Sequence, residues 1–305
     1  MIYTSELDNI IMERRIDSTI ETLSSYIPKI FKDFEVYKIL KAKIYKPKNS
    51  HKDYPGKKSY VLELPSCDMQ CPFCNKFHVI FNVQDEGMFS FCLVEELVDA
   101  IIKGKVKSLT VTGGEPLFFD NTIYVKTKDF ILFIIQICHT FKIPIKINTN
   151  GTNYEFIKWL YTDASKFYNM DMMPDWISVD FKTSRTKYIE LFTEGTYEEN
   201  KSKIDNIFRT IAFFYNMIMH DLKPERKMIE FITLPMPGFI DIDIVKQMAT
   251  CLPTGARWRF KPYCKLGPHY DSSYDNHLKE IFSDEDIDHL VRIASRYVFD
   301  TRRTL

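Results

Sequence analysis

The chain is poor in glycine, with ten in 305 residues, and it has no net charge, because 41 lysines and arginines balance 41 aspartates and glutamates. A balanced charge gives no general attraction to nucleic acid or to an acidic membrane surface, so we expect neither as a partner. No apolar run reaches the ~18 residues of a membrane helix. The first residues also lack the charged start and apolar stretch of a signal peptide.

Cysteines are few, and their pattern is not that of a disulfide framework. There are seven, an odd number, and only one C-x2-C pair occurs among them. Because disulfides belong to oxidising compartments, this pattern predicts a protein of the reducing cytoplasm. The hydrophobic share of 45% and the charged share of 27% are ordinary for a globular protein. The length is sufficient for one large core with or without an appendage.

Three of the cysteines stand close together: Cys67, Cys71 and Cys74 have the spacing C-x3-C-x2-C. An iron–sulfur cube normally takes four thiolates. Three from one loop leave one iron with an open position, where a ligand can bind and react. The alternative is a structural zinc ion with His78 or Cys92 as its fourth ligand, although zinc motifs usually bring two pairs of ligands. The spacing favours the cluster and leaves zinc as the alternative.

A second motif, Gly113-Gly114-Glu115-Pro116, directly follows the β-branched run 109–112. Such a run indicates a buried strand, and the paired glycines mark its end. In a chain with so few glycines, two adjacent ones indicate a sharp turn or the close approach of a ligand to the backbone. Glu115 places a carboxylate at the carboxyl end of the strand, where α/β barrels carry their active sites. A carboxylate there is suited to binding an ammonium group.

Two further β-rich runs also end in polar residues. The turn signal Asn150-Gly151 follows the run 145–149, and a later run ends in Asp180 and Lys182. Side chains alternate along a strand, so Asp180 and Lys182 lie on one face. Lys182 can neutralise a ligand carboxylate, and Asp180 can accept hydrogen bonds from hydroxyls or bind a cation. The alternative is a solvated ion pair at a strand end.

In this order, the cysteine loop and the Gly-Gly-Glu-Pro, Thr-Asn-Gly and Asp-x-Lys motifs resemble the radical S-adenosylmethionine (radical SAM) enzymes. Within that superfamily they look most like the glycyl-radical-enzyme activating enzymes of the pyruvate formate-lyase activase type. Weaker matches follow in Leu-Pro-Met-Pro-Gly-Phe at 234–239 and in Lys-Pro-Tyr-Cys-Lys-Leu-Gly at 261–267. The resemblance covers most of the chain, from about Tyr60 to Tyr270.

The resemblance implies that Cys67, Cys71 and Cys74 hold a [4Fe–4S] cluster whose open iron binds S-adenosylmethionine (SAM). Reductive cleavage of SAM would then yield methionine and a 5′-deoxyadenosyl radical that abstracts hydrogen from a substrate. By the same resemblance the substrate is the glycine of a partner glycyl radical enzyme, and the reductant is a flavodoxin or ferredoxin. The other cofactor contacts that it implies, around SAM and a monovalent cation, are Phe73, Gly113, Gly114, Glu115, Asn148, Thr149, Asp180 and Lys182.

The chain also departs from the activase pattern. Asn148 stands where the activases have aspartate, Cys264 stands in place of a histidine, and the segment Gly-Pro-Gly-x-Arg before the cysteines is absent. These differences keep open a radical SAM enzyme that acts on a small nucleoside or deazapurine, or on a peptide. A zinc-stabilised binding protein without catalysis is the lower-ranked alternative.

The last predicted strand carries the candidate substrate contacts. Arg257, Arg259 and Lys261 alternate on one of its faces, and Cys264 follows. If that face points into the barrel, the three cations can bind an anionic group of a substrate. If it points outward, they are surface charges.

About six strand–helix units predict an α/β fold with a parallel sheet and right-handed crossovers. Six are too few for a closed eight-stranded barrel and fit the partial (β/α)6 TIM-like barrel of radical SAM enzymes, which is open on one side. We expect residues 1–58 to form a helical, lysine-rich extension that ends in a linker at 46–56. Residues 59–305 would form the barrel and a final helix at 284–298. The expected strands are 60–64, 108–112, 144–148, 176–181, 228–234 and 256–262.

Overall fold

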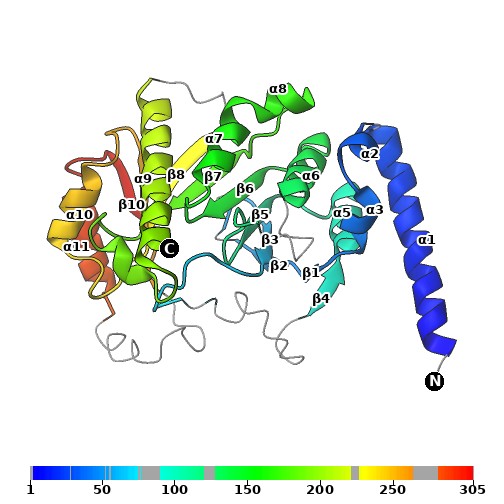
Figure 1. Cartoon of the computed structure of the whole chain (residues 1–305), viewed down its shortest axis with the longest axis horizontal. Coiled ribbons are helices and arrows are strands. Elements are labelled where there is room, and N and C mark those ends of the chain that lie inside the picture. The colour runs from blue at the N-terminus through cyan, green and yellow to red at the C-terminus, as the bar shows by residue number, and fades with distance from the viewer. Residues whose placement is uncertain are drawn as a thin grey trace.

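The structure is a computed structural model that describes residues 3–27, 29–51, 53–54, 56–74, 76, 90–119, 128–220, 227–263 and 281–304. Figure 1 shows its elements along the chain. The helices are α1 (Tyr3–Tyr26), α2 (Ile30–Asp33), α3 (Val36–Lys41), α5 (Val94–Ile102), α6 (Lys128–Thr140), α7 (Tyr154–Thr162), α8 (Ala164–Tyr168), the short 3-10 helix η2 (Tyr188–Leu191), α9 (Tyr197–Met219), α10 (Ile242–Ala249) and α11 (Asp284–Ala294). The strands are β1 (Lys43–Tyr45), β2 (Lys48–Ser50), β3 (Ser59–Leu64), β4 (Phe91–Leu93), β5 (Leu109–Gly113), β6 (Ile145–Thr149), β7 (Trp176–Asp180), β8 (Met228–Thr233), β9 (Arg257–Phe260) and β10 (Asp300–Arg303).

Eight of these strands form one sheet in the order β10-β9-β8-β7-β6-β5-β3-β2. From β3 to β10 every neighbouring pair is parallel, and only the edge strand β2 is antiparallel. Each new strand is added on the same side of the last, as in a barrel, but the end strands β2 and β10 do not pair. The predicted α/β partial barrel, with its six predicted strands side by side, is confirmed.

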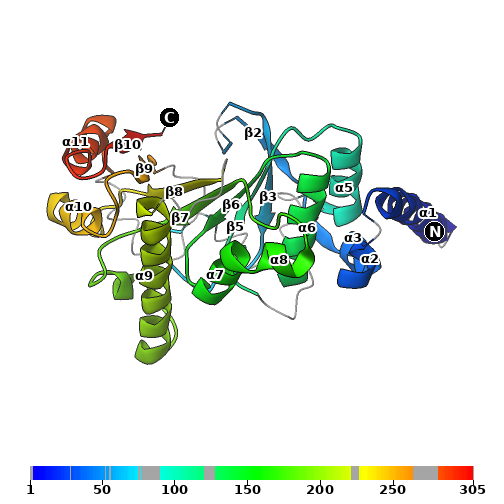
Figure 2. The ribbon, with the colours of Figure 1, turned by 90° about the horizontal axis from the view of Figure 1, so that it is seen from above.

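The two faces of the sheet differ in polarity. One row of paired residues crosses five strands and is fully apolar: Leu62, Val111, Ile147, Ile177 and Ile229. All five are at most 5% exposed. Helices α6, α7 and α9 lie along this side of the sheet (Figure 2). The core therefore sits between the sheet and its outer helices, because burial of apolar surface drives folding.

The opposite, inner face is polar. A second row of paired residues comprises Asn148, Ser178, Glu230 and Arg257. Glu230 is buried and accepts hydrogen bonds from Ser178 and from Lys146, whose Nζ lies 2.7 Å away. Buried charges are tolerated when they are paired in this way. The inner face thus holds a buried charge that is paired with a cation.

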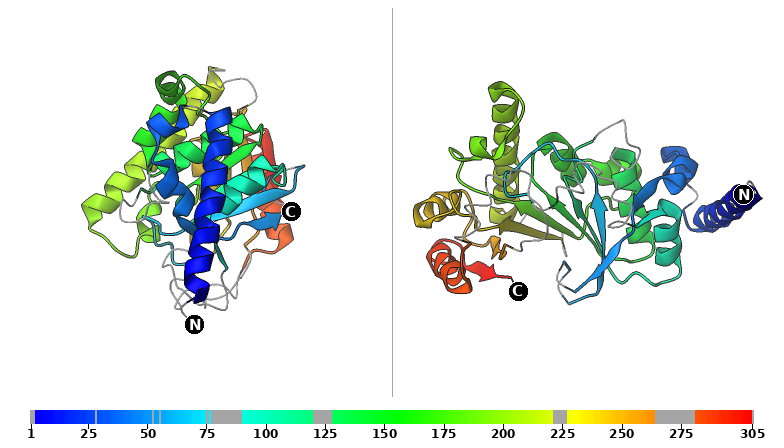
Figure 3. Two further views of the ribbon diagram at one scale, coloured as in Figure 1. Left: turned by 90° about the vertical axis from the view of Figure 1, so that its right-hand side faces the viewer. Right: turned by 90° about the horizontal axis from the view of Figure 1, so that it is seen from below.

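The N-terminal helices lie at one end of the molecule, opposite α10 and α11 (Figure 3). Helix α1 buries Ile16 and Leu23 against the body. The predicted linker at 46–56 is partly wrong, because residues 48–50 form β2 and pair with β3. Strand β1 likewise pairs with β4, which follows the cysteine loop. The chain before Ser59 therefore contributes strands as well as helices.

Helix α9 begins at Tyr197, where Thr196 and Glu199 form a capping box. One strand differs from expectation. Strand β10 was not expected at all, since Asp300-Thr301-Arg302-Arg303 has no apolar run. Its position is set by pairing with β9. No helix in the described part of the chain combines the length and the apolarity needed to cross a bilayer.

Candidate active site

The predicted cofactor residues meet at one place, the carboxyl ends of β3, β5, β6 and β7. A cavity of about 200 Å³ lies there. Of the residues predicted from the sequence, those that line it are Cys67, Cys71, Phe73, Cys74, Gly113, Gly114, Glu115, Asn148, Thr149, Asp180, Lys182 and Lys261. Parallel strands bring their carboxyl ends to the same edge of a sheet, so four segments that are distant in sequence share one pocket.

The cysteine loop follows β3 directly and turns back over the strand ends. Burial raises the pKa of all three thiols, and that of Cys71 reaches about 12. Such thiols keep their protons unless a cation displaces them, because a thiolate is costly in an apolar site. A metal centre supplies that cation. The loop therefore offers three cysteine ligands, of which Cys71 is buried and Cys67 and Cys74 are partly buried, and all three need positive charge nearby to become anionic.

The arrangement of these thiols differs from that of a single-ion site. No three His, Cys, Asp or Glu side chains in the described residues are placed to hold one metal ion, the three cysteines included. Zinc needs all its ligands around one point, whereas each cysteine of a cluster binds its own iron. Cys92, a predicted alternative fourth ligand, lies in β4 opposite Ile44 and does not line the cavity. The other, His78, lies outside the described residues.

The paired glycines are needed where β5 meets the cysteine loop. A Cβ on Gly113 would lie 2.3 Å from the carbonyl oxygen of Leu64, and one on Gly114 would lie 1.8 Å from that of Ser66. The backbone N–H of Gly114 donates to the Leu64 carbonyl and that of Glu115 to the Ser66 carbonyl, both at a distance of 2.9 Å. The close approach inferred from the sequence is thus made, at least in part, by the loop's own backbone.

Glu115 connects the ends of β5 and β6. It is 1% exposed, and its carboxylate accepts from the Thr149 hydroxyl at 2.7 Å and from the Asn150 and Leu117 N–H groups at 2.5 and 2.9 Å. Burial and the charge of Asp68 raise its pKa to about 7, against these three hydrogen bonds. The carboxylate of Glu115, expected to bind an ammonium group, therefore lines the cavity and also joins the ends of β5 and β6 through its hydrogen bonds.

Asp180 and Lys182 form an ion pair of 2.6 Å at the end of β7. Burial favours the neutral amine, but Asp180 outweighs it and raises the pKa of Lys182 above its usual value. The hydroxyl of Tyr188 accepts from the Lys182 N–H at 2.9 Å and donates to the Asp180 carbonyl at 3.3 Å. Tyr188 is fully buried, so it fixes the backbone that carries the pair.

Two other predicted contacts have distinct environments. Phe73 is buried and packs edge-to-face on Phe239, with ring centroids 5.3 Å apart. Asn148 donates to Thr112 at 3.4 Å, while its buried Oδ1 has no hydrogen-bond donor among the described residues. A buried acceptor without a donor carries a desolvation cost, which a ligand donor or a cation would relieve. This atom fits a site that takes a polar ligand.

The predicted substrate-binding cations, Arg257, Arg259 and Lys261, do not all lie at the cavity. Lys261 lines the cavity, as expected if this face points inward. Arg257 and Arg259 instead pair with Asp300 of β10, and Arg259 contacts both carboxylate oxygens at 3.0 Å. The sequence argument missed this because β10 itself was not predicted. Cys264 lies outside the described residues.

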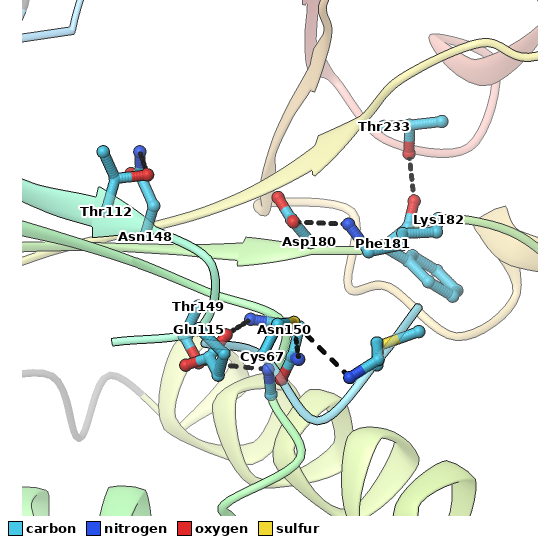
Figure 4. Close-up of polar contacts among 12 residues, drawn as sticks. Cys67, Thr112, Glu115, Asn148, Thr149, Asn150, Asp180, Phe181, Lys182 and Thr233 are labelled. Atoms are coloured by element: carbon cyan, nitrogen blue, oxygen red, sulfur yellow. Dashed lines mark hydrogen bonds and ion pairs between the residues drawn. The ribbon is translucent and has the colours of Figure 1, made fainter. Parts of the chain in front are cut away.

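Several residues that the prediction did not name as contacts lie close to the cysteine loop. Asn150 donates to Asp68, and Lys203 of α9 donates to the Asp68 carbonyl at 2.9 Å. Lys76 lines the cavity and pairs with Glu63. Asn150 belongs to the predicted Thr-Asn-Gly motif and was within reach of the sequence argument. No sequence pattern marks the contacts of Lys203 and Lys76, because each joins two separate segments of the chain. Figure 4 shows Asn150 beside Cys67.

Comparisons with known proteins show the family to which the chain belongs. The model of the family "Radical SAM superfamily" matches residues 64–234, more than half of the 305 residues. A protein of Methanocaldococcus jannaschii named "Putative glycyl-radical enzyme activating enzyme MJ1227" is 27% identical over 254 residues, which are 81% of this chain and 88% of the relative. The 7-carboxy-7-deazaguanine synthase of Clostridium acetobutylicum is 20% identical over 181 residues, 56% of this chain and 77% of that protein. Among solved structures, SuiB of Streptococcus suis has a TM-score of 0.49 and 14% identity over 80% of this chain, which spans half of SuiB.

Proposed function

The chain belongs to the radical SAM superfamily and is an enzyme, and we propose that it cleaves SAM reductively to start radical chemistry on a substrate C–H bond. A bound [4Fe–4S] cluster supplies the electron for this cleavage, which yields methionine and a 5′-deoxyadenosyl radical. The observation that carries the proposal is that three cysteines from one loop, with Cys71 buried and the other two partly buried, share a cavity with the ends of β5, β6 and β7. Among the described residues that line this cavity there is no fourth cysteine and no histidine.

Within this proposal, Cys67, Cys71 and Cys74 hold the cluster. Lys182 faces the carboxylate of SAM, since its charge is secured by Asp180 at 2.6 Å. Glu115 faces the methionine amino group.

The remaining contacts complete the proposed cofactor site. Phe73 packs beside the adenine. Asn148 and Thr149 supply oxygens to SAM or to a monovalent cation, and the Oδ1 of Asn148 is an acceptor without a donor in the described structure. Gly113 and Gly114 bind the methionine end through their backbone.

We propose the glycine of a partner glycyl radical enzyme as the substrate. The support is the named function of the Methanocaldococcus jannaschii relative, which this chain matches over 88% of that protein's length. A sheet whose end strands do not pair leaves an open side, and an open side suits a protein loop better than a closed barrel does. A flavodoxin or ferredoxin would reduce the cluster. Reduced cysteines that hold a cluster suit the reducing cytoplasm.

A second candidate substrate is a small molecule of the deazapurine type. The match to the Clostridium acetobutylicum synthase favours it, although that match covers 56% of this chain. Asn148 and Cys264, where the activases have aspartate and histidine, keep this candidate in view.

The test is anaerobic reconstitution with iron and sulfide, reduction by dithionite, and addition of SAM. We expect 5′-deoxyadenosine from the native protein and none from Cys71→Ser. Adding a glycyl radical enzyme encoded beside this chain should give an electron paramagnetic resonance (EPR) signal of a glycine radical. Turnover of a deazapurine precursor without such a signal would favour the second candidate. A protein that binds zinc and no iron would contradict both.

A further inference from the structure

Asn150, in the turn after β6, has a side chain whose orientation is determined by its hydrogen bonds. Its Oδ1 accepts from the backbone N–H and the hydroxyl of Thr152, at 2.9 and 2.8 Å. A backbone N–H is always a donor, so the oxygen of the amide must face Thr152. The Nδ2 therefore faces the other way, toward the cysteine loop. Asn150 is 5% exposed, so water does not compete for these contacts.

The Nδ2 of Asn150 meets the first cysteine and the residue after it. It donates to the Asp68 carboxylate at 2.8 Å. It also lies 3.9 Å from the sulfur of Cys67, which Figure 4 shows beside Asn150. Cys67 also accepts from the Met69 N–H at 3.4 Å. The carboxylate of Asp68 is thus held beside one of the three expected cluster ligands. On the other side, Lys203 donates to the Asp68 carbonyl and fixes the loop backbone.

We propose that the Asp68–Asn150 pair sets the reduction potential of the cluster from the Cys67 side. The inference rests on the proposed function, because it needs a cluster on Cys67, Cys71 and Cys74. Net charge and hydrogen bonds at the sulfurs tune the potentials of iron–sulfur clusters. A carboxylate beside Cys67 opposes addition of an electron. Asn150 limits that effect by donating to Asp68, and it holds the carboxylate in one place.

The pair allows a test in which chemistry changes and shape does not. Asn150→Asp keeps an oxygen for Thr152 but adds a second carboxylate beside Cys67. Asp68→Asn keeps an acceptor for Asn150 but removes the charge. The double variant N150D/D68N exchanges the two groups and restores both the hydrogen bond and the charge. Asn206→Asp on α9 is the matched control, because it makes the same change at an exposed hydrogen bond to Arg209.

The experiment is a redox titration of each anaerobically reconstituted protein without SAM, followed by EPR. We expect the ratio of reduced to oxidised cluster at a fixed potential to fall about tenfold in Asn150→Asp and to rise about tenfold in Asp68→Asn. For a one-electron couple these are shifts of about 59 mV in opposite directions. The double variant should return to within about threefold of the native ratio, a shift of under 30 mV by the same constant. The control should stay within about twofold.

Shifts of the two single variants in the same direction, or no return in the double variant, would overturn the inference. Iron and sulfide content, measured on each protein, shows whether every titration follows an intact cluster. If Asn150→Asp fails to assemble one, the sign of the Asp68→Asn shift still decides, since an unchanged or lowered potential in that variant contradicts the proposal. Failure of the native protein to bind iron would instead remove the proposed function.

Discussion

The substitution Gly114→Ala tests how β5 positions the cysteine loop. An added Cβ would lie 1.8 Å from the carbonyl oxygen and 2.6 Å from the carbonyl carbon of Ser66, both backbone atoms. Real Cβ atoms essentially never approach closer than 3.0 Å, so the loop and the strand end must move apart by more than 1 Å. Cys67 is the next residue and moves with Ser66. The substitution therefore shifts an expected cluster ligand while the cysteine itself is kept, and the added Cβ would also lie 3.3 Å from the Cβ of Cys67.

The cost follows from the contacts at this crossing. Separation strains or breaks the hydrogen bonds from Gly114 to Leu64 and from Glu115 to Ser66. Each contributes about 0.5–1.5 kcal/mol, and overpacking in a rigid site costs about 1–3 kcal/mol. We therefore expect the free energy of unfolding of the metal-free protein to fall by about 2–6 kcal/mol. The iron bound per chain after reconstitution should fall with it.

Urea unfolding followed by circular dichroism measures the first effect, and iron and sulfide analysis measures the second. Gly255→Ala is the matched control, because a Cβ there lies 3.9 Å from Ile218, an ordinary contact. It should change stability by less than about 1 kcal/mol. If Gly114→Ala unfolds at the native urea midpoint and takes up a full cluster, the inferred packing of loop against strand is incorrect.

Three further substitutions test the interior. Lys146→Met leaves Glu230 buried without its cation and should lower the free energy of unfolding by about 3–5 kcal/mol. In urea unfolding, the double variant K146M/E230M should lose less free energy of unfolding than the two single variants lose together. Burial alone would raise the pKa of Asp175, but the His139 ring 3.6 Å away, the hydrogen bond from the Ile145 N–H and the charge of Lys227 outweigh burial and lower this pKa from 3.8 to about 2. Its stabilisation is thus present above pH 3.8 and lost as pH falls through 2, so Asp175→Asn should cost about 2 kcal/mol at pH 7. That difference should vanish in unfolding curves near pH 2. Tyr188→Phe removes the acceptor of the Lys182 N–H and should weaken SAM binding several-fold in equilibrium dialysis; unchanged affinity would show that Tyr188 does not position the pair.

The sequence predicted what local patterns determine. The apolar strand runs and the motif at the end of each strand were sufficient to place the cysteines, Glu115, Asp180 and Lys182 around one cavity. Because the strands pair in parallel, motifs that follow successive strands along the chain lie next to one another at one edge of the sheet. For this reason the fold class and the grouping of these residues around one cavity were predictable together.

The sequence did not predict what depends on contacts between distant segments. Strand β10 is polar and is ordered by pairing with β9, so its Asp300 and the ion pairs to Arg257 and Arg259 were not foreseen. The glycine pair was attributed to ligand approach, but its spacing to Leu64 and Ser66 shows that the loop backbone also requires it. The contact of Asn150 with Asp68 joins residues 82 apart in the chain.

The central claim is that three thiolates hold a cluster whose fourth iron is free to bind SAM. Mössbauer spectroscopy of protein reconstituted with iron-57 observes each iron of the cluster and tests this claim most directly. We predict that addition of SAM changes the signal of one iron in four and leaves the other three as they were, in the native protein and in Gly255→Ala. A spectrum that SAM does not alter, in a protein with a full cluster, would contradict the claim.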